Sequence, residues 1–257
     1  MGILPSEIDV MYTFELNCPN VRKLKYKIST LKKFKRILKK GKKDRDRISK
    51  IIKTSRIKKG AFAENWDLFF DILTSNYCHN KQPICNDGVC TTYDDLKIAS
   101  HYYNLENKFT YFDNKHSKNY SILSGGYLLR DLMKELSSII EHDAQKNDKI
   151  KIPKISIYSG HDLNLNGILG ILRPDNQSFG NPKFASNLVI ELWKHEYIKN
   201  EYRVRIIYNG KVLSLFNEDP KPKWCDSKSC DFLSLKSKIY DSTDADFYYM
   251  CNSKDVL

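Results

Sequence analysis

The stretch from Lys154 to Leu172, KISIYSGHDLNLNGILGIL, changes its hydrophobic period abruptly and constrains the fold more than any other part of the chain. Ile155 and Ile157 alternate with polar residues, and β-branched residues in a short run favour a strand. A glycine then interrupts this pattern, and leucine and isoleucine recur at helical spacing. The sequence therefore predicts a strand that ends at His161 and Asp162, followed at once by a helix.

A strand-to-helix junction favours anion binding, because the first backbone N–H groups of a helix have no partner within it. A histidine beside a carboxylic acid at such a place suggests chemistry on a phosphate group. The alternative is a chance pair at a helix cap, where aspartate is common. A second pair, His142–Asp143, ends a polar helix with no strand before it, and we interpret it as a solvated helix end.

The chain has 257 residues, of which 41% are hydrophobic, and this is enough for one large domain or for a domain with an insertion. No apolar run approaches the ~20 residues of a membrane span. The first residues, MGILPSEIDVMYTF, lack the basic and then apolar pattern of a signal peptide.

The net charge of +12 is concentrated in one segment. Residues 22–59 hold 19 of the 43 lysines and arginines but only two acidic residues, Asp44 and Asp46. Two interpretations stay open for this segment, a solvated helix face or a surface for a polyanion such as a heparan-type polysaccharide. Nucleic acid is less favoured, because only Tyr26 and Phe34 interrupt the basic residues as aromatics.

The seven cysteines favour disulfides over zinc, because no Cys-x2-Cys spacing is present. Disulfides in turn imply an oxidising compartment. Within the cluster CHNKQPICNDGVC, a bridge between Cys85 and Cys90 is locally plausible and leaves Cys78 unpaired. Sequons at Asn119 and Asn176 agree weakly with a glycoprotein.

The periodicity predicts a helix-rich α/β protein. An Asn209-Gly210 turn is expected after the last strand, and Thr91 or Thr92 is expected to cap a helix. Gly41 is expected to end the first helix, and the residues after Leu105 are expected to form a loop as far as Ser121. The expected helices are 22–40, 48–52, 61–76, 93–105, 123–142 and 232–238, and the expected strands are 154–159, 185–194 and 202–209.

Two segments, the strand-to-helix junction and the expected strand at 185–194, resemble parts of a known protein family. SIYSGHD, followed after a gap by FASNLVIELWKHE, resembles the C-terminal half of the histidine acid phosphatases. NYCHNKQPICNDGVC, VRIIYNG and YYMC make the chain most similar, within that family, to the 2-phosphoxylose phosphatase group. That group removes phosphate from the xylose of the proteoglycan linkage region. The resemblance runs from about Asn17 to Cys251.

The resemblance implies a two-step reaction without a cofactor or metal. A histidine in an Arg-His-Gly motif attacks phosphorus, while arginines and a second histidine bind the phosphoryl oxygens. His161 matches that second histidine, and Asp162 matches the acid that protonates the leaving group. The family pattern also suggests disulfides that join Cys18 to Cys251 and Cys225 to Cys230.

One part of the family pattern is missing, because Arg-His-Gly occurs nowhere in this sequence. We therefore expect an incomplete histidine-phosphatase domain in which residues 1–60 are a lead-in with the Lys-rich helix, residues 61–257 are the C-terminal part, and a helical insertion covers about 61–107. The intact protein is expected in the secretory pathway, in the Golgi or outside the cell. This chain alone is expected to be inactive. The alternative is a non-catalytic polyanion-binding protein derived from a phosphatase.

Overall fold

A computed structural model describes residues 18–53, 65–145, 153–175, 180–216, 222–243 and 247–254. The chain divides into two compact units. The first unit combines Met1–Lys25, Lys115–Gln177 and Pro182–Leu257, and the second combines Tyr26–Asn114 and Ser178–Asn181. Helix α2 (Pro19–Thr30) carries the chain from the first unit into the second. No helix in the described ranges is long and apolar enough to cross a membrane.

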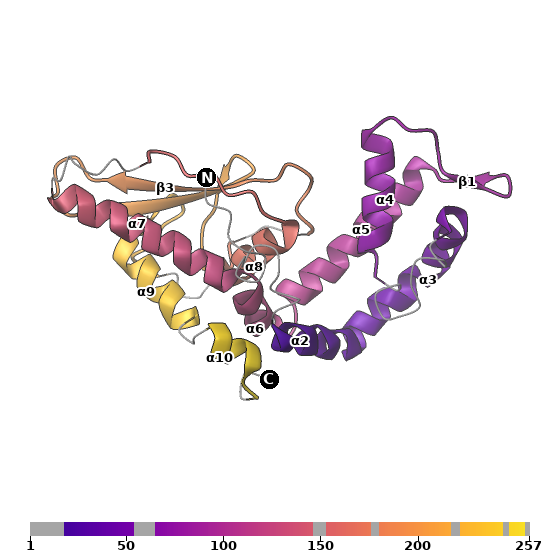
Figure 1. Ribbon diagram of the computed structural model, residues 1–257, viewed down its shortest axis with the longest axis horizontal. Coiled ribbons are helices and arrows are strands. Elements are labelled where there is room, and N and C mark those ends of the chain that lie inside the picture. The colour runs from indigo at the N-terminus through magenta and orange to yellow at the C-terminus, as the bar shows by residue number, and fades with distance from the viewer. Residues whose placement is uncertain are drawn as a thin grey trace. The chain divides into compact units, whose positions relative to one another are not determined.

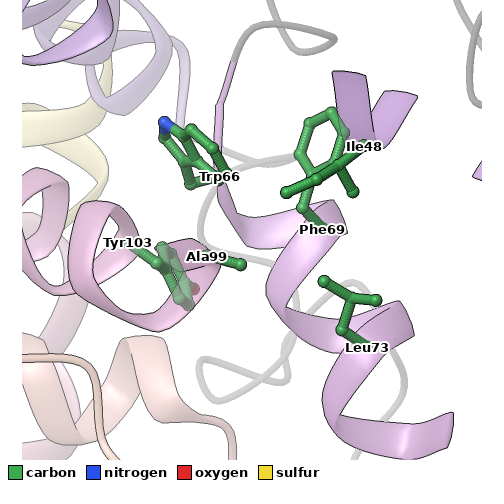
Figure 2. Close-up of a cluster of buried hydrophobic side chains, with 6 residues drawn as sticks. All are labelled: Ile48, Trp66, Phe69, Leu73, Ala99 and Tyr103. Carbon is green, nitrogen blue, oxygen red and sulfur yellow. The ribbon is translucent and has the colours of Figure 1, made fainter. Parts of the chain in front are cut away.

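The second unit is a small helical assembly. Its helices are α3 (Lys32–Ile52), α4 (Asp67–Cys78) and α5 (Tyr93–Tyr111), and a short hairpin of β1 (Cys85–Asn86) and β2 (Val89–Cys90) precedes α5. Figure 2 shows the core that joins the three helices. The buried side chains of this core are Ile48, Trp66, Phe69, Leu73, Ala99 and Tyr103. Thr92 caps α5 as expected, since its side chain accepts a hydrogen bond from the backbone N–H of Asp95.

Two predictions for this unit were wrong. Gly41 does not end a helix but lies buried inside α3, and the break falls before it, at Leu31. A Cβ atom on Gly41 would lie 2.7 Å from Cζ2 of Trp66, so the glycine allows the indole to pack against the helix. Helix α5 also continues beyond residue 105, because Phe109 is buried against Phe34, with their ring centroids 5.9 Å apart.

The first unit combines helices with a four-stranded antiparallel sheet. Strands β3 (Leu188–Lys194) and β4 (Tyr202–Tyr208) pair along their full length, and β5 (Lys211–Val212) and β6 (Cys230–Asp231) both pair with β4. The Asn-Gly turn between β4 and β5 is confirmed, with positive φ angles at Asn209 and Gly210. The strands predicted at 185–194 and 202–209 therefore lie in one sheet, as expected.

The helices of the first unit are α6 (Ser117–Ser121), the π-helical turn η3 (Ile122–Gly126), α7 (Tyr127–Gln145), α8 (Asp162–Leu172), α9 (Phe232–Thr243) and α10 (Phe247–Asn252). Of these, α7 and α9 run along the sheet (Figure 1). Disulfides join Cys18 to Cys251 and Cys225 to Cys230 in this unit, and Cys85 to Cys90 in the other. Cys78 is a free, exposed thiol.

The prediction of a strand at 154–159 was wrong. Within the described residues this segment pairs with no strand, and it does not join the sheet of β3 and β4. Ile155 is 78% exposed and Ile157 is 89% exposed. A strand requires a neighbour for its backbone hydrogen bonds, and the local sequence pattern cannot provide one.

Candidate active site

The predicted junction residues lie together at the start of helix α8. His161 occupies the N-cap position with an extended backbone, φ −112° and ψ 163°, and Asp162 is the first helical residue. The backbone N–H of His161 donates to Oδ1 of Asn164 over 2.9 Å, and the N–H of Leu163 donates to Oδ1 of Asp162 over 2.9 Å. His161 is exposed and Asp162 is half-buried, so both are accessible at the end of the helix.

Backbone packing holds helix α8 in place. A Cβ atom on Gly125 in η3 would lie 2.5 Å from the backbone nitrogen of Ile168, and one on Gly167 would lie 2.7 Å from the backbone nitrogen of Gly125. Only glycine allows two backbones to approach so closely. The SGG sequence of η3 and the NGI sequence of α8 together therefore position the helix that carries His161 and Asp162.

A groove with a volume of about 1120 Å³ opens in front of this helix end. One wall is the segment Pro153–Tyr158, which continues through Gly160 to His161. Another wall is β3, and apolar side chains of α7 line the groove between them, namely Leu128, Leu132, Leu136 and Ile139. The groove exceeds the ~300–1,000 Å³ of an ordinary small-molecule site, so it has room for more than a phosphate ester.

Glu135 of α7 ties the unpaired segment to the helix. Its carboxylate accepts hydrogen bonds from the hydroxyls of Ser156 and Tyr158. The hydrogen bond to Glu135, together with burial, raises the pKa of Tyr158 to about 12, so the phenol stays protonated at neutral pH. These bonds hold the segment extended beside α7, where no described strand pairs with it.

The second His-Asp pair is not simply a solvated helix end, and this corrects the prediction made for it. His142 lines the groove. Asp143 accepts hydrogen bonds from Nζ of Lys194 at 2.8 Å and from the hydroxyl of Tyr202. The hydrogen bond from Lys194, followed by that from Tyr202, lowers the pKa of Asp143. Asp143 therefore fastens the end of α7 to β3 and β4.

The sequence pattern did not single out Asn164, which belongs to the site. The residue is 3% exposed, and its Nδ2 finds no hydrogen-bond partner among the described residues, although its Oδ1 caps the helix. A buried amide with a free donor is uncommon, because leaving it unsatisfied costs about 1–3 kcal/mol. The signal that could have revealed it is its position three residues after the N-cap, where a capping side chain is expected.

Comparison with known proteins gives relatives of one kind. The chain is 29% identical over 141 residues to 2-phosphoxylose phosphatase 1 of Xenopus tropicalis, which is 55% of this chain and 26% of that protein. It is 26% identical over 140 residues to the proteins of the same name from Homo sapiens and Mus musculus, which is 54% of this chain and 27% of each. The matched region thus spans about a quarter of the length of these relatives.

A family model gives the broader assignment. The model of the histidine phosphatase superfamily (branch 2) matches residues 17–209, which include the described part of the groove, the helix end with His161 and Asp162, and the β3–β4 hairpin. This match covers most of the chain, and the mixed α/β architecture agrees with it. The chain therefore belongs to the histidine phosphatase superfamily, branch 2.

Proposed function

We propose that this chain provides the phosphate-binding and proton-donating part of a phosphomonoester hydrolase of the 2-phosphoxylose phosphatase type. The observation that carries the proposal is the placement of His161 and Asp162 at the accessible N-terminus of α8, beside a groove. A helix N-terminus attracts a phosphate dianion through its unpaired N–H groups and its dipole.

The proposed roles follow the resemblance residue by residue. A nucleophilic histidine of the Arg-His-Gly motif forms a bond from its ring nitrogen to phosphorus, and the bond from phosphorus to the leaving oxygen breaks. Asp162 gives its proton to that oxygen, which departs as the alcohol. Water then attacks the phosphohistidine and passes a proton to the Asp162 carboxylate, and inorganic phosphate leaves. His161 donates to the phosphoryl oxygens, whose charge is best stabilised by donors already in place.

We further propose that Asn164 assists His161. The Oδ1 atom of Asn164 orients the backbone of His161, which leaves its Nδ2 as a donor next to the groove. A phosphoryl oxygen would satisfy this donor. Binding and capping would then be coupled through one buried amide.

The nucleophile is not in these 257 residues, since no Arg-His-Gly is present. We propose that this chain alone hydrolyses phosphate esters little or not at all, because a proton donor without a nucleophile cannot form the phosphoenzyme. The groove between segment 153–160 and β3 is the place where we expect a segment with the motif to lie. Extended backbone that pairs with no described strand on one side of the groove, and apolar α7 side chains between the walls, support this placement.

The experiment that tests the proposal is a titration of the chain with orthophosphate, in which ³¹P NMR line broadening measures the affinity. We expect binding that weakens at least about tenfold in His161→Ala and in Asn164→Ala, since each removes a donor worth on the order of 1.4 kcal/mol or more to a charged oxygen. His142→Ala is the matched control, because it removes another histidine of the same groove. Equal affinities in His161→Ala and the unaltered chain would end the proposal.

The alternative is a non-catalytic polyanion-binding protein derived from a phosphatase. It predicts the same lack of activity, so the transcript separates the two. If the phosphatase proposal is right, we expect in-frame codons for Arg-His-Gly upstream of the codon for Met1. An in-frame stop codon there, with protein made from Met1, would favour the alternative.

We also propose a secretory location, in the Golgi or outside the cell, for the protein in the cell. Three disulfides support it, because such bonds form and persist in oxidising compartments. The proposed substrate is a phosphorylated glycan or small molecule.

A further inference from the structure

Helix α3 of the second unit carries a line of exposed positive charges, here called the basic stripe. Its members are Lys32, Arg36, Lys39, Lys43 and Lys50, all exposed. They are separated by four, three, four and seven residues, and at 3.6 residues per turn this spacing returns to the same face of a helix. The stripe extends for about 27 Å along the helix axis.

The opposite face of α3 faces the core of the unit, so the stripe has one fixed orientation. The buried residues of the helix are Phe34, Gly41, Arg45, Ile48 and Ile51. Packing against α4 and α5 prevents rotation of α3 about its own axis. The positive charges are therefore presented together, as a rigid row.

Four members of the basic stripe have no counter-charge in the described part of the chain, and the exception is Lys50, whose positive charge helps to lower the pKa of Asp46 after the larger effect of Lys42. None of the five side chains forms an ion pair or hydrogen bond there, whereas several neighbours do. Arg47 binds Asp95, and Lys33 binds Asp113 at 3.8 Å. Asp46 lies beside the stripe, but it is bound by Lys42, whose hydrogen bond lowers its pKa and keeps the carboxylate ionised and occupied.

Like charges one helical turn apart, as in the run from Lys32 to Lys43, are costly for the isolated helix, because like charges at i,i+4 repel. The repulsion is relieved when a polyanion with closely spaced charges lies along the row and its counterions are released. The stripe thus fits a linear polyanion.

We propose that the basic stripe binds a linear sulfated polysaccharide. An anionic membrane fits less well, because α3 has no large hydrophobic side chain among those exposed, and such side chains anchor a surface helix. Single-stranded nucleic acid fits less well, because no exposed aromatic side chain of α3 is available for base stacking. Sulfate groups on a flexible chain require only charge, and the stripe supplies charge alone.

The test uses the complete chain and a size-defined heparin oligosaccharide, with affinity measured by fluorescence anisotropy at physiological salt. The stripe variant combines Lys32→Gln, Arg36→Gln, Lys39→Gln and Lys43→Gln. We expect its affinity to fall roughly 600-fold, since four basic residues are removed and each one near an anionic surface contributes about a factor of five. The slope of log K against log salt should also decrease by roughly 0.7–0.9 for each contact that is lost.

The matched control removes the same charge from the other unit. It combines Lys118→Gln, Lys199→Gln, Lys211→Gln and Lys228→Gln, which are exposed lysines whose ammonium groups form no hydrogen bond or ion pair within the described residues. We expect a less than about threefold change, because only long-range charge is altered and salt screens it. An equal loss of affinity in both variants would refute the stripe as a site.

Two further measurements keep the proposal open to refutation. Short duplex DNA and phosphatidylcholine vesicles with phosphatidylserine are the competing probes, and tighter binding to either would overturn the assignment to a sulfated polysaccharide. If the stripe variant fails to fold, lysine acetylation of the unaltered chain replaces it. Heparin should protect Lys39 and Lys43 but not Lys97, and equal acetylation of all three would contradict the proposal.

Discussion

Gly167 of α8 and Gly125 of η3 pack backbone against backbone, so that a Cβ atom on Gly167 would lie 2.7 Å from the backbone nitrogen of Gly125 and 2.8 Å from Oγ of Ser124. This pair connects the core of the first unit to the helix end that carries His161 and Asp162. Gly167→Ala should therefore lower the free energy of unfolding by about 1–3 kcal/mol, the usual scale of overpacking. Urea unfolding, monitored by circular dichroism, measures this loss of stability.

Ser138→Ala on the exposed face of α7 is the control for this substitution and should stay within about 0.5 kcal/mol of the unaltered chain. Phosphate binding should weaken in Gly167→Ala as well, because the start of α8 shifts with the helix. A Gly167→Ala chain of unaltered stability would mean that α8 does not pack on η3 as described.

The proton-donor role of Asp162 predicts a specific kinetic pattern in a protein that also contains the Arg-His-Gly segment. Asp162→Asn should lower kcat by ~10²–10⁴ on a substrate with a poor leaving group, with little loss of substrate binding. A nitrophenyl ester should be much less affected, because its leaving group needs little protonation. His161→Ala should lower turnover on both substrates, and His142→Ala should lower it on neither. Normal turnover of the poor substrate by Asp162→Asn would rule out the role.

Asp95 predicts how the stability of the second unit depends on pH. Burial would raise the pKa of Asp95, but hydrogen bonds from Arg47 and from the backbone of Thr92 outweigh it and lower the pKa below its ordinary value. A lowered folded-state pKa contributes stability above the unfolded value, near 3.9, and this contribution disappears as pH falls through the folded value.

Asp95→Asn should accordingly destabilise the chain at neutral pH by about 1–3 kcal/mol, and the difference should shrink as the pH is lowered below about 4. Chemical unfolding at a series of pH values measures both effects. Asp94→Asn is the matched control, since Asp94 lies in the same helical turn but its side chain is 79% exposed in its pair with Lys97. A constant difference between Asp95→Asn and the unaltered chain down to acidic pH would contradict the ion-pair explanation.

The disulfide between Cys18 and Cys251 predicts a large contribution to stability, because its sequence separation is 233 residues. In the chain-entropy description, a loop of this length is worth on the order of 5 kcal/mol, and a short loop roughly 2 kcal/mol. The double variant Cys18→Ser with Cys251→Ser should therefore unfold at much lower denaturant than Cys85→Ser with Cys90→Ser, whose loop is short. Equal midpoints in the two variants would show that loop length does not govern the effect.

Local chemistry made several features predictable from the sequence. The Asn209-Gly210 turn was predictable because both residues tolerate a positive φ, and the cap at Thr92 because a hydroxyl satisfies the first N–H groups of a helix. The start of α8 at His161 and Asp162 was predictable because the hydrophobic period changes there. Each of these decisions depends on a few neighbouring residues.

Other features depend on contacts between residues that are distant in the chain, and only the tertiary structure decided them. Gly41 was expected to break a helix, but the indole of Trp66 packs against it, and this distant contact makes glycine suitable inside α3. Asn164 gained its place in the site only through burial, which the pattern of α8 does not reveal. Ile155 and Ile157 have the alternation of a strand, yet a strand forms only when another backbone pairs with it, and no described segment does so. The sequence by itself determined local conformation, whereas pairing and burial required the whole fold, because hydrogen bonds between strands and contacts between helices join residues that the local pattern cannot relate.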